Sequence, residues 1–298
     1  MDALFVFQHS RADDIEIRYA LRGIARHLPY IRKVWVFGDR PKFLSDDTTR
    51  IEHVPHADMA RMDGSTVPIR NFFKMLFLSS LIGDLDSEYL WFCDDFIVID
   101  DVAELEMRKT RYIQDVAECK SRGKGLWKES LWRTYDLLKR LGYPGYNFEI
   151  HTPTYFRKRW VFDAYCDFKD FITNDRWLGM LGPTAILNHA YKGHQMPLTR
   201  LSEEGWNVGW HKQPPGHADV VEKTRGKRFL NFDDEAFGDG LRQFLAERFP
   251  NPCAFEAGGR REPDQSGAGA EGIWSFSTDT RAGIGVARGE RLSGNPVA

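Results

Sequence analysis

The stretch that decides the fold is SEYLWFCDDFIVIDD, residues 87–101. Strand-forming residues at 89–92 lead directly into Asp94 and Asp95, and a second apolar run follows at 96–99. Adjacent carboxylates repel each other and resist burial, so an apolar strand that ends in two of them needs a partner for their charge. The pattern predicts a buried strand that presents two acidic side chains at its carboxyl end.

The sequence before this stretch alternates between strand and helix patterns. Strands are predicted at 3–11, 33–39, 50–56 and 88–95, and helices at 17–28 and 71–81. Asp13 or Asp14 is positioned to cap the first helix, and Pro29 is positioned to end it.

This order of elements also locates the ligand-binding edge of the sheet. Alternating strands and helices predict an α/β protein with a mostly parallel central sheet flanked by helices. Ligands of such sheets bind beyond the carboxyl ends of the strands. Because His9, Asp39, Asp94 and Asp95 all come at the ends of predicted strands, we expect them along one edge.

The second half of the chain predicts more helix than strand. Helices are predicted at 125–142, 157–172 and 183–193, an extended segment at 146–156, and a strand, an acidic loop and a final helix within 226–252. Gly142 is expected to end the first of these helices. From residue 257 the chain is rich in Gly, Ala, Ser and Arg. We therefore expect one domain over 1–256 and a disordered or loosely attached tail over 257–298.

Composition narrows the class of protein. The 298 residues are 42% hydrophobic and 13% aromatic, which supports a substantial core, and the formal net charge of -2 gives no overall attraction to nucleic acid or anionic membrane. The N-terminus lacks a signal-peptide pattern, no run approaches the roughly 20 apolar residues of a membrane span, and the four cysteines are scattered. We expect a cytoplasmic protein with reduced thiols. Motifs of phosphate loops, dinucleotide-binding folds, zinc proteases and serine hydrolases are absent from the sequence.

A divalent cation is the partner that best explains the two carboxylates. Mg²⁺ or Mn²⁺ prefers oxygen ligands, and it takes one or two carboxylates while water and phosphate oxygens complete its shell. Asp94 and Asp95 at a rigid strand end supply such ligands. The alternative is a solvated turn in which one Asp caps a following helix.

Three further groups of polar residues are candidates for the site. Asp233 lies in a second acidic stretch, LNFDDEAF, which alternatively forms the first turn of a helix. His151 follows an apolar stretch, where a histidine is either structural or a proton acceptor near neutral pH. Arg70, Asn71 and Lys74 open a predicted helix, where they either meet a phosphate or are solvated.

Several ordered blocks of the sequence resemble one family. The blocks are DDIEIRYALRGIARHLPYIRKVWVFGDRPKFLSDDTTRIEHVPHADM (13–59), LWFCDDFIV (90–98), FEIHTPTYFRK (148–158) and RFLNFDDEAFGDGLRQFLAERFPNPCAFE (228–256). Together they resemble the Stealth-type sugar-phosphate transferases and the short glycosyltransferase-like proteins related to them, some of which phages encode. The resemblance spans residues 1–256 and implies a GT-A-like nucleotide-diphospho-sugar transferase fold in one catalytic domain.

The resemblance implies a glycosyltransferase that uses a nucleotide-diphospho-sugar donor and Mg²⁺ or Mn²⁺. Asp94 and Asp95 then hold the cation, and Asp95 is a catalytic residue together with His151 and Asp233. The expected donor-binding residues are Gln8, His9, Arg11, Asp39, Arg70, Asn71 and Lys74. His151 is the expected general base toward the acceptor hydroxyl, and Asp233 either orients it or takes the base role itself.

Two alternatives keep the same fold. A sugar-1-phosphate transferase releases a nucleoside monophosphate where a glycosyltransferase releases the diphosphate. A non-catalytic binding module is the second alternative, because FQHSR (7–11) stands where the family has an acidic residue. The acceptor stays open between a polysaccharide, a protein side chain and a modified DNA base.

Overall fold

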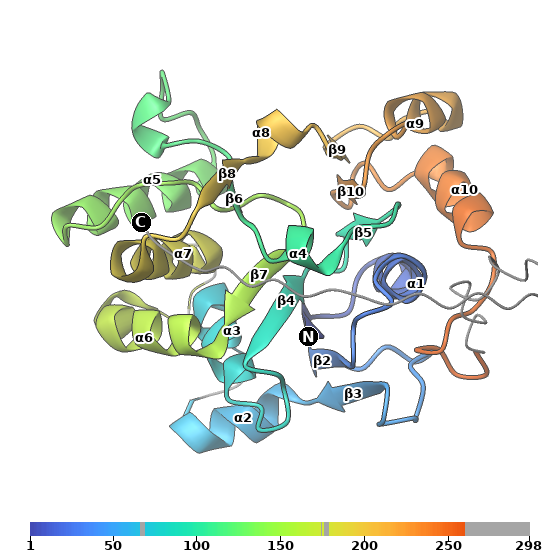
Figure 1. The fold of residues 1–298 in the computed structure, drawn as a ribbon, viewed down its shortest axis with the longest axis horizontal. Coiled ribbons are helices and arrows are strands. Elements are labelled where there is room, and N and C mark those ends of the chain that lie inside the picture. The colour runs from blue at the N-terminus through green and yellow to red at the C-terminus, as the bar shows by residue number, and fades with distance from the viewer. Residues whose placement is uncertain (66–68, 174, 176–178, 260–298) are drawn as a thin grey trace, which may run out of the picture. The chain divides into compact units, whose positions relative to one another are not determined.

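The centre of the fold is a five-stranded sheet in the order β3-β2-β1-β4-β7. Its strands are β1 (Asp2–Phe7), β2 (Val34–Gly38), β3 (Ile51–Val54), β4 (Glu88–Phe92) and β7 (Thr154–Arg157). β1 to β4 are parallel, and β7 pairs with β4 in the antiparallel direction. The computed structural model describes residues 1–65, 69–173, 175 and 179–259. Helices lie on both sides of the sheet (Figure 1), so the predicted α/β class with a mostly parallel sheet is confirmed.

The helices form two groups. In the first, α6 packs on α3 and α7, and α5 packs on α7; their bounds are α3 (Phe72–Ser80), α5 (Leu126–Arg140), α6 (Lys158–Phe168) and α7 (Gly182–His194). The second group is α1 (Ile15–His27), α9 (His217–Lys223) and α10 (Asp239–Arg248). Shorter elements are α2 (His56–Asp63), α4 (Glu104–Met107), α8 (Leu201–Glu204), η1 (Val116–Glu118) and η2 (Lys169–Phe171). None of the described helices combines the length and the apolar character that a membrane span needs.

A second, smaller sheet lies against α1. It contains β5 (Ile97–Val98), β10 (Phe229–Phe232) and β9 (Asn207–Trp210) in the order β5-β10-β9. β10 is antiparallel to β5 and parallel to β9. A pair of short strands, β6 (Thr110–Tyr112) and β8 (Leu198–Arg200), completes the sheet structure of the described chain. The second sheet matters for function because it returns the C-terminal third of the chain to the end of β4.

The inner strands are buried because helices cover both faces of the main sheet. β2 is buried along its whole length, and β4 is buried from its second residue onward. Such strands read as continuous apolar runs rather than alternating patterns. Phe5 stacks on Phe92 with ring centroids 5.2 Å apart, and Trp35 and Tyr89 are almost completely buried. This packed core holds the ends of β1 and β4 rigidly side by side.

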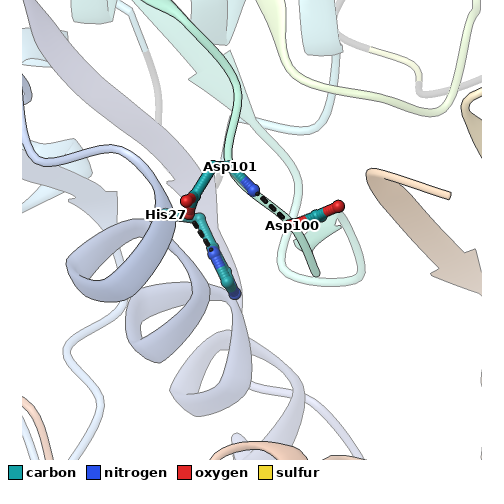
Figure 2. Close-up of side chains that lie close together, drawn as sticks. All are labelled: His27, Asp100 and Asp101. Carbon is teal, nitrogen blue, oxygen red and sulfur yellow. Dashed lines mark hydrogen bonds and ion pairs between the residues drawn. The ribbon is translucent and has the colours of Figure 1, made fainter. Parts of the chain in front are cut away.

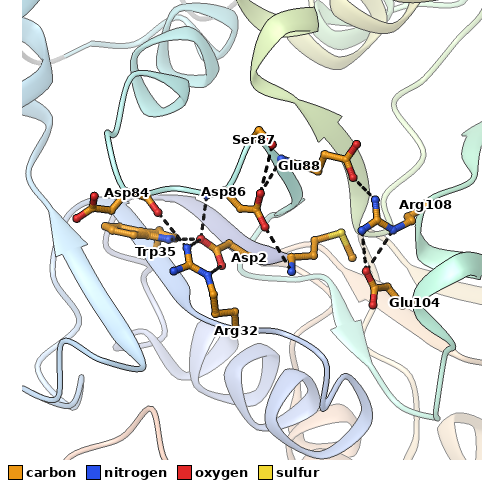
Figure 3. Close-up of polar contacts among 10 residues, drawn as sticks. Asp2, Arg32, Trp35, Asp84, Asp86, Ser87, Glu88, Glu104 and Arg108 are labelled. Carbon is orange, nitrogen blue, oxygen red and sulfur yellow. Dashed lines mark hydrogen bonds and ion pairs between the residues drawn. The ribbon is translucent and has the colours of Figure 1, made fainter.

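A polar network satisfies the buried acid at the amino end of β1 (Figure 3). Asp2 is fully buried, and its carboxylate accepts hydrogen bonds from Arg32 Nε at 2.9 Å and Arg32 Nη2 at 2.7 Å. Trp35 Nε1 donates at 2.9 Å and Asp86 N at 3.0 Å. A carboxylate tolerates burial when a cation and several donors surround it. Asp2 is therefore a buried acid whose charge is balanced, and the acids at the opposite edge of the sheet can be compared with it.

The predicted elements are confirmed with small shifts, and one predicted contact is wrong. Asp14 occupies the N-cap position of α1, but its side chain makes no capping hydrogen bond, and its φ of 60° is left-handed. Its carboxylate accepts instead from Ser10 N at 3.0 Å, because the loop before α1 folds back on itself. Gly142 follows the end of α5 with a φ of 76°, as expected for a glycine that ends a helix.

The described chain ends in a segment that is anchored to α1. Glu256 is buried, and it accepts hydrogen bonds from Arg22 Nε at 2.6 Å and Arg22 Nη2 at 2.8 Å. Ala257 N donates to Phe43 O at 2.8 Å. Most of the predicted tail, 260–298, lies outside the described residues, so its disorder stays a prediction.

Candidate functional site

The two carboxylates that follow β4 lie in a tight turn. Phe96 N donates to Cys93 O at 3.2 Å, which places Asp94 and Asp95 at the two central positions of the turn. Both residues are half-buried, and the short strand β5 follows them. Neither acid therefore caps a helix.

The pairing of β4 with β7 brings His151 toward the end of β4. The register ends with Trp91 paired with Thr154, and His151 precedes Thr154 by three residues. The ring of His151 lies 6.2 Å from the ring of Phe96, the residue that ends the acidic turn. The predicted base and the predicted metal ligands therefore occupy one site.

The second sheet brings another acidic residue to the same turn. The register of β10 with β5 pairs Leu230 with Ile97, and the charge of Asp234, which follows β10, raises the pKa of Asp94. β9 lies parallel beside β10 and ends directly before His211. Residues from the two sheets therefore meet around Asp94.

His211 connects the predicted catalytic residues. Its Nδ1 atom lies 3.8 Å from Asp233 Oδ2, and its ring centroid lies 5.7 Å from that of His151. The Asp233 carboxylate also accepts from Lys212 N at 3.0 Å and 2.9 Å. Contact between Asp233 and His151 therefore passes through His211, which the sequence analysis did not select.

The loop between β1 and α1 adds a fourth carboxylate. Ser10 Oγ donates to Glu16 Oε2 at 2.7 Å. The same hydroxyl accepts from Ala12 N at 3.2 Å and Asp14 N at 3.1 Å, which fixes its position. Because β1 and β4 are neighbours, this loop holds the buried Glu16 near the acidic turn.

The acidic turn has unusual electrostatics. Burial, together with the charges of Glu16 and Asp234, raises the pKa of Asp94 to about 7. The pKa of Asp95 is raised well above its usual range, first by burial and then by the charge of Asp94. Asp234 also contributes to this effect on Asp95. Asp2 has an arginine to balance its charge, whereas the charged groups that act on Asp94 and Asp95 are other acids.

Strained backbone surrounds the same site. Five described non-glycine residues have a positive φ, namely Asp13 (57°), Asp14 (60°), His151 (51°), Gln195 (47°) and Lys212 (70°). All but Gln195 lie in the loops that form the site. Such conformations persist where the surrounding structure enforces them, and they concentrate at functional sites.

A cavity opens between the start of α1 and the loop after β10. Its volume is about 210 Å³. Its lining residues are Arg11, Ala12, Glu16, Asp234, Glu235, Phe237 and Arg242. Acidic and basic side chains in one small cavity suit a ligand that carries both a cation and an anion, as a metal-bound phosphate does.

A separate group of possible metal ligands lies at the far end of α1 (Figure 2). His27 Nδ1 lies 2.7 Å from Asp101 Oδ1, and Asp100 completes the group. Within the described ranges this is the one set of three such residues whose ligand atoms lie within 4.8 Å of one another. Both carboxylates are exposed, and Glu16 is eleven residues before His27, about 16 Å along the helix. This group is therefore distinct from the site at the acidic turn.

Two of the predicted donor-binding residues are ordered at the carboxyl edge of the sheet. His9 N donates to Asp39 Oδ2 at 2.9 Å, which joins the ends of β1 and β2. His9 Nδ1 also lies 2.8 Å from Asp14 Oδ2. Gln8 and Arg11 are exposed beside them, and Arg11 lines the 210 Å³ cavity.

The predicted phosphate-binding residues at α3 divide into two kinds. Asn71 is buried and caps α3, because its Oδ1 accepts from Lys74 N at 3.0 Å and its Nδ2 donates to Asp175 O at 3.2 Å. Both polar atoms of the Asn71 amide therefore already form hydrogen bonds within the protein. Arg70 is exposed, and the side chain of Lys74 is half-buried.

Sequence reasoning missed two residues of the site. Glu16 resembled a first-turn acid of a helix, and His211 follows a strand with weak apolar character. Proximity to Asp94 identifies Glu16, and proximity to His151 identifies His211. Both signals exist only in the folded chain.

A cavity of about 730 Å³ lies elsewhere, along α5. Arg122, Trp132, Arg140 and Phe171 are among its lining residues. Arg122 already forms a two-bond ion pair with Asp136, at 2.9 Å and 3.0 Å. None of the predicted site residues lines this cavity.

Comparisons with known proteins were made for both sequence and structure. No family model matches the sequence, and no curated protein matches it. The fold is similar to a crystal structure of the galactosyltransferase LgtC in complex with donor and acceptor sugar analogs, with 16% identity, a TM-score of 0.43, and coverage of 84% of this chain and 95% of that chain. It is also similar to an active-site mutant of LgtC, with 15% identity, a TM-score of 0.44, and coverage of 83% and 95%. The Stealth-type resemblance stays a prediction of the sequence.

Proposed function

We propose that this protein is a glycosyltransferase that uses a nucleotide-diphospho-sugar donor and a divalent cation. The observation that carries the proposal is the group of carboxylates at the carboxyl edge of the sheet: Glu16, Asp94, Asp95 and Asp234. The charges of Glu16 and Asp234 raise the pKa of Asp94. The same two charges and that of Asp94 raise the pKa of Asp95. A group of acids that destabilise one another is the expected apo state of a cation site.

The chemistry of these donors suits Mg²⁺ or Mn²⁺. Carboxylate oxygens are the preferred ligands of hard cations, and Asp94 and Asp95 supply the one or two that such an ion takes from a protein. When bound, the cation neutralises the charge that develops on the leaving nucleotide.

The donor side of the site is the crevice between β1 and β4. In open parallel sheets, ligands bind at the point where the strand order reverses. Here that point is β1, which has β2 on one side and β4 on the other. Arg11 and Arg242 line the cavity beside Glu16 and Asp234, where guanidinium groups suit phosphate oxygens. His9 and Asp39 extend the same edge toward β2.

The acceptor side is the group formed by His151, His211 and Asp233. Burial lowers the pKa of His151, and the neighbouring His211 lowers it further, so the imidazole is neutral at pH 7. A neutral imidazole accepts the proton of an acceptor hydroxyl. His211 lies between the other two residues, in contact with the ring of His151 and 3.8 Å from the carboxylate of Asp233.

The experiment that tests the proposal is the incubation of the protein with a panel of nucleotide sugars and Mn²⁺, with mass spectrometry of the released nucleotide. We expect release of a nucleoside diphosphate that chelation or Asp95→Asn abolishes. Asp84→Asn is the matched control, because Asp84 is an exposed acid at the opposite edge of the sheet. Release of a nucleoside monophosphate instead identifies a sugar-phosphate transferase. Donor binding without any release identifies a binding module.

A further inference from the structure

Positive charge is concentrated in one segment, residues 120–140, which consists of α5 and the loop before it. The segment contains seven lysines and arginines and two acids, a net charge of +5 in a chain whose formal net charge is -2. Six of the seven basic side chains are exposed. Helix α5 lies at one edge of the fold, away from α1 and α10 (Figure 1). This α5 surface is therefore a basic patch separate from the candidate site.

One face of α5 is used by the fold, and the other faces solvent. The buried residues of α5 are Ser130, Leu131, Thr134 and Leu138, and the helix packs on α7. The exposed residues recur every three or four positions, so they form one stripe on the opposite face. They are Leu126, Glu129, Arg133, Asp136 and Arg140.

Apolar side chains lie among the cations of the α5 surface. Leu126, the first residue of α5, is 58% exposed. Trp127 and Trp132 are half-buried, and each lies beside a cation: Lys128 Nζ is 4.8 Å from the ring centroid of Trp127, and Arg122 Cζ is 4.6 Å from that of Trp132. Exposed aliphatic and aromatic groups within a basic patch are typical of surfaces that bind an anionic bilayer.

The 730 Å³ cavity lies within the same surface. Arg122, Arg133 and Arg140 line it, together with the rings of Trp132 and Phe171. Guanidinium groups suit phosphate oxygens, and a cavity of this volume is large enough for the headgroup of a lipid. The cavity therefore adds a place for one phosphate to the general attraction of the patch.

We propose that the α5 surface binds membranes that contain anionic phospholipid. Leu126 and Trp127 enter the headgroup region, and one lipid phosphate occupies the cavity beside Arg140. This inference goes beyond the proposed function and does not depend on it. Lipid is favoured over nucleic acid because Leu126 gains nothing from a phosphate backbone, and because base stacking needs open aromatic faces, whereas both tryptophans are half-buried beside cations.

The test is co-sedimentation of the full chain with vesicles at ~0.1 M salt. One set of vesicles contains equal parts of phosphatidylcholine and phosphatidylglycerol, and the other contains phosphatidylcholine alone. We expect binding to the first set and not to the second, and a decrease of that binding as salt is added, because salt screens the attraction.

Two variants test the two parts of the surface. Lys120, Lys124 and Lys139 are exposed, and their combined replacement by Gln should weaken binding about 100-fold, from about fivefold for each lysine. Leu126→Ser should weaken it about five- to fifteenfold, because a partly exposed leucine no longer enters the bilayer.

The matched control removes the same charge elsewhere. Lys42, Lys223 and Arg225 are exposed and lie outside the α5 surface, so their combined replacement by Gln should leave the vesicle affinity within about twofold of wild type. Melting temperatures establish that all variants fold. A DNA duplex and a DNA single strand, measured in the same buffer, provide the comparison with nucleic acid.

Several results overturn the inference. They are no binding to the phosphatidylglycerol vesicles, equal binding to both sets of vesicles, the same loss in both triple variants, unchanged binding of Leu126→Ser, or tighter binding to DNA than to the vesicles. None of these results bears on the proposed function, because vesicle binding needs neither a nucleotide sugar nor Mn²⁺.

Discussion

Removal of one charge from the acidic turn should stabilise the metal-free protein while it abolishes activity. Asp94→Asn keeps the size of the side chain and deletes a carboxylate that burial and the charges of Glu16 and Asp234 disfavour. A carboxyl group whose pKa is higher in the folded than in the unfolded chain binds its proton more tightly when folded. The Asp94 carboxyl group therefore does not lower the free energy of unfolding at a pH below its ordinary pKa of 3.8. The loss of stability grows as the pH rises from there toward about 7.

The magnitude follows from this pKa difference. A tenfold change in proton affinity corresponds to about 1.4 kcal/mol, so the Asp94 carboxylate costs the folded state about 4 kcal/mol at pH 8. Between pH 8 and pH 6 the chelated wild-type protein should regain about 1 kcal/mol through this group. Asp94→Asn should lose that dependence and be more stable than wild type at pH 8.

The assay is urea unfolding of both proteins with a chelator at pH 6 and pH 8. Comparison with the variant removes the contributions of other titrating groups, such as His27 and His56, whose pKa values are lowered by burial and which act in the opposite direction. Mn²⁺ should stabilise wild type more at pH 8 than at pH 6 and should not stabilise the variant. A variant with the same stability and pH dependence as chelated wild type refutes the electrostatic account of the turn.

Three further predictions concern the acceptor side and the C-terminal segment. His151→Ala should slow transfer by about 10²- to 10⁴-fold while donor affinity, measured by calorimetry with Mn²⁺, stays unchanged; wild-type transfer would return His151 to a structural role. Glu256→Gln should lower the free energy of unfolding by about 3 kcal/mol, because Arg22 then loses its buried partner, and urea unfolding would show no change if the pair contributes nothing. A chain that ends at Gly259 should keep the wild-type melting temperature within about two degrees, since the tail lacks the apolar residues of a core, and a larger loss would show that the tail packs.

The sequence by itself determined the elements of this protein and one half of its site. The apolar runs of β1, β2 and β4 and the periodicity of α1 are local patterns, so they locate strands and helices without knowledge of the fold. The strand-end position of Asp94 and Asp95 is equally local, and the parallel order places it at the ligand-binding edge. The side-chain role of Asp14 could not be predicted, because it depends on how the whole loop from His9 to Glu16 folds back on itself.

Only the tertiary structure decided which residues join the acidic turn. The antiparallel pairing of β7 with β4 brings His151 to Phe96 at the end of the turn, and the second sheet brings His211 to His151 and Asp233 to His211. His151, His211 and Asp233 lie 57 or more positions after Asp94 in the chain, and strand register over such distances is fixed by the packing of two sheets rather than by any local pattern. The raised pKa of Asp94 has the same origin, because it depends on burial and on charges from distant segments, which no single stretch of sequence contains.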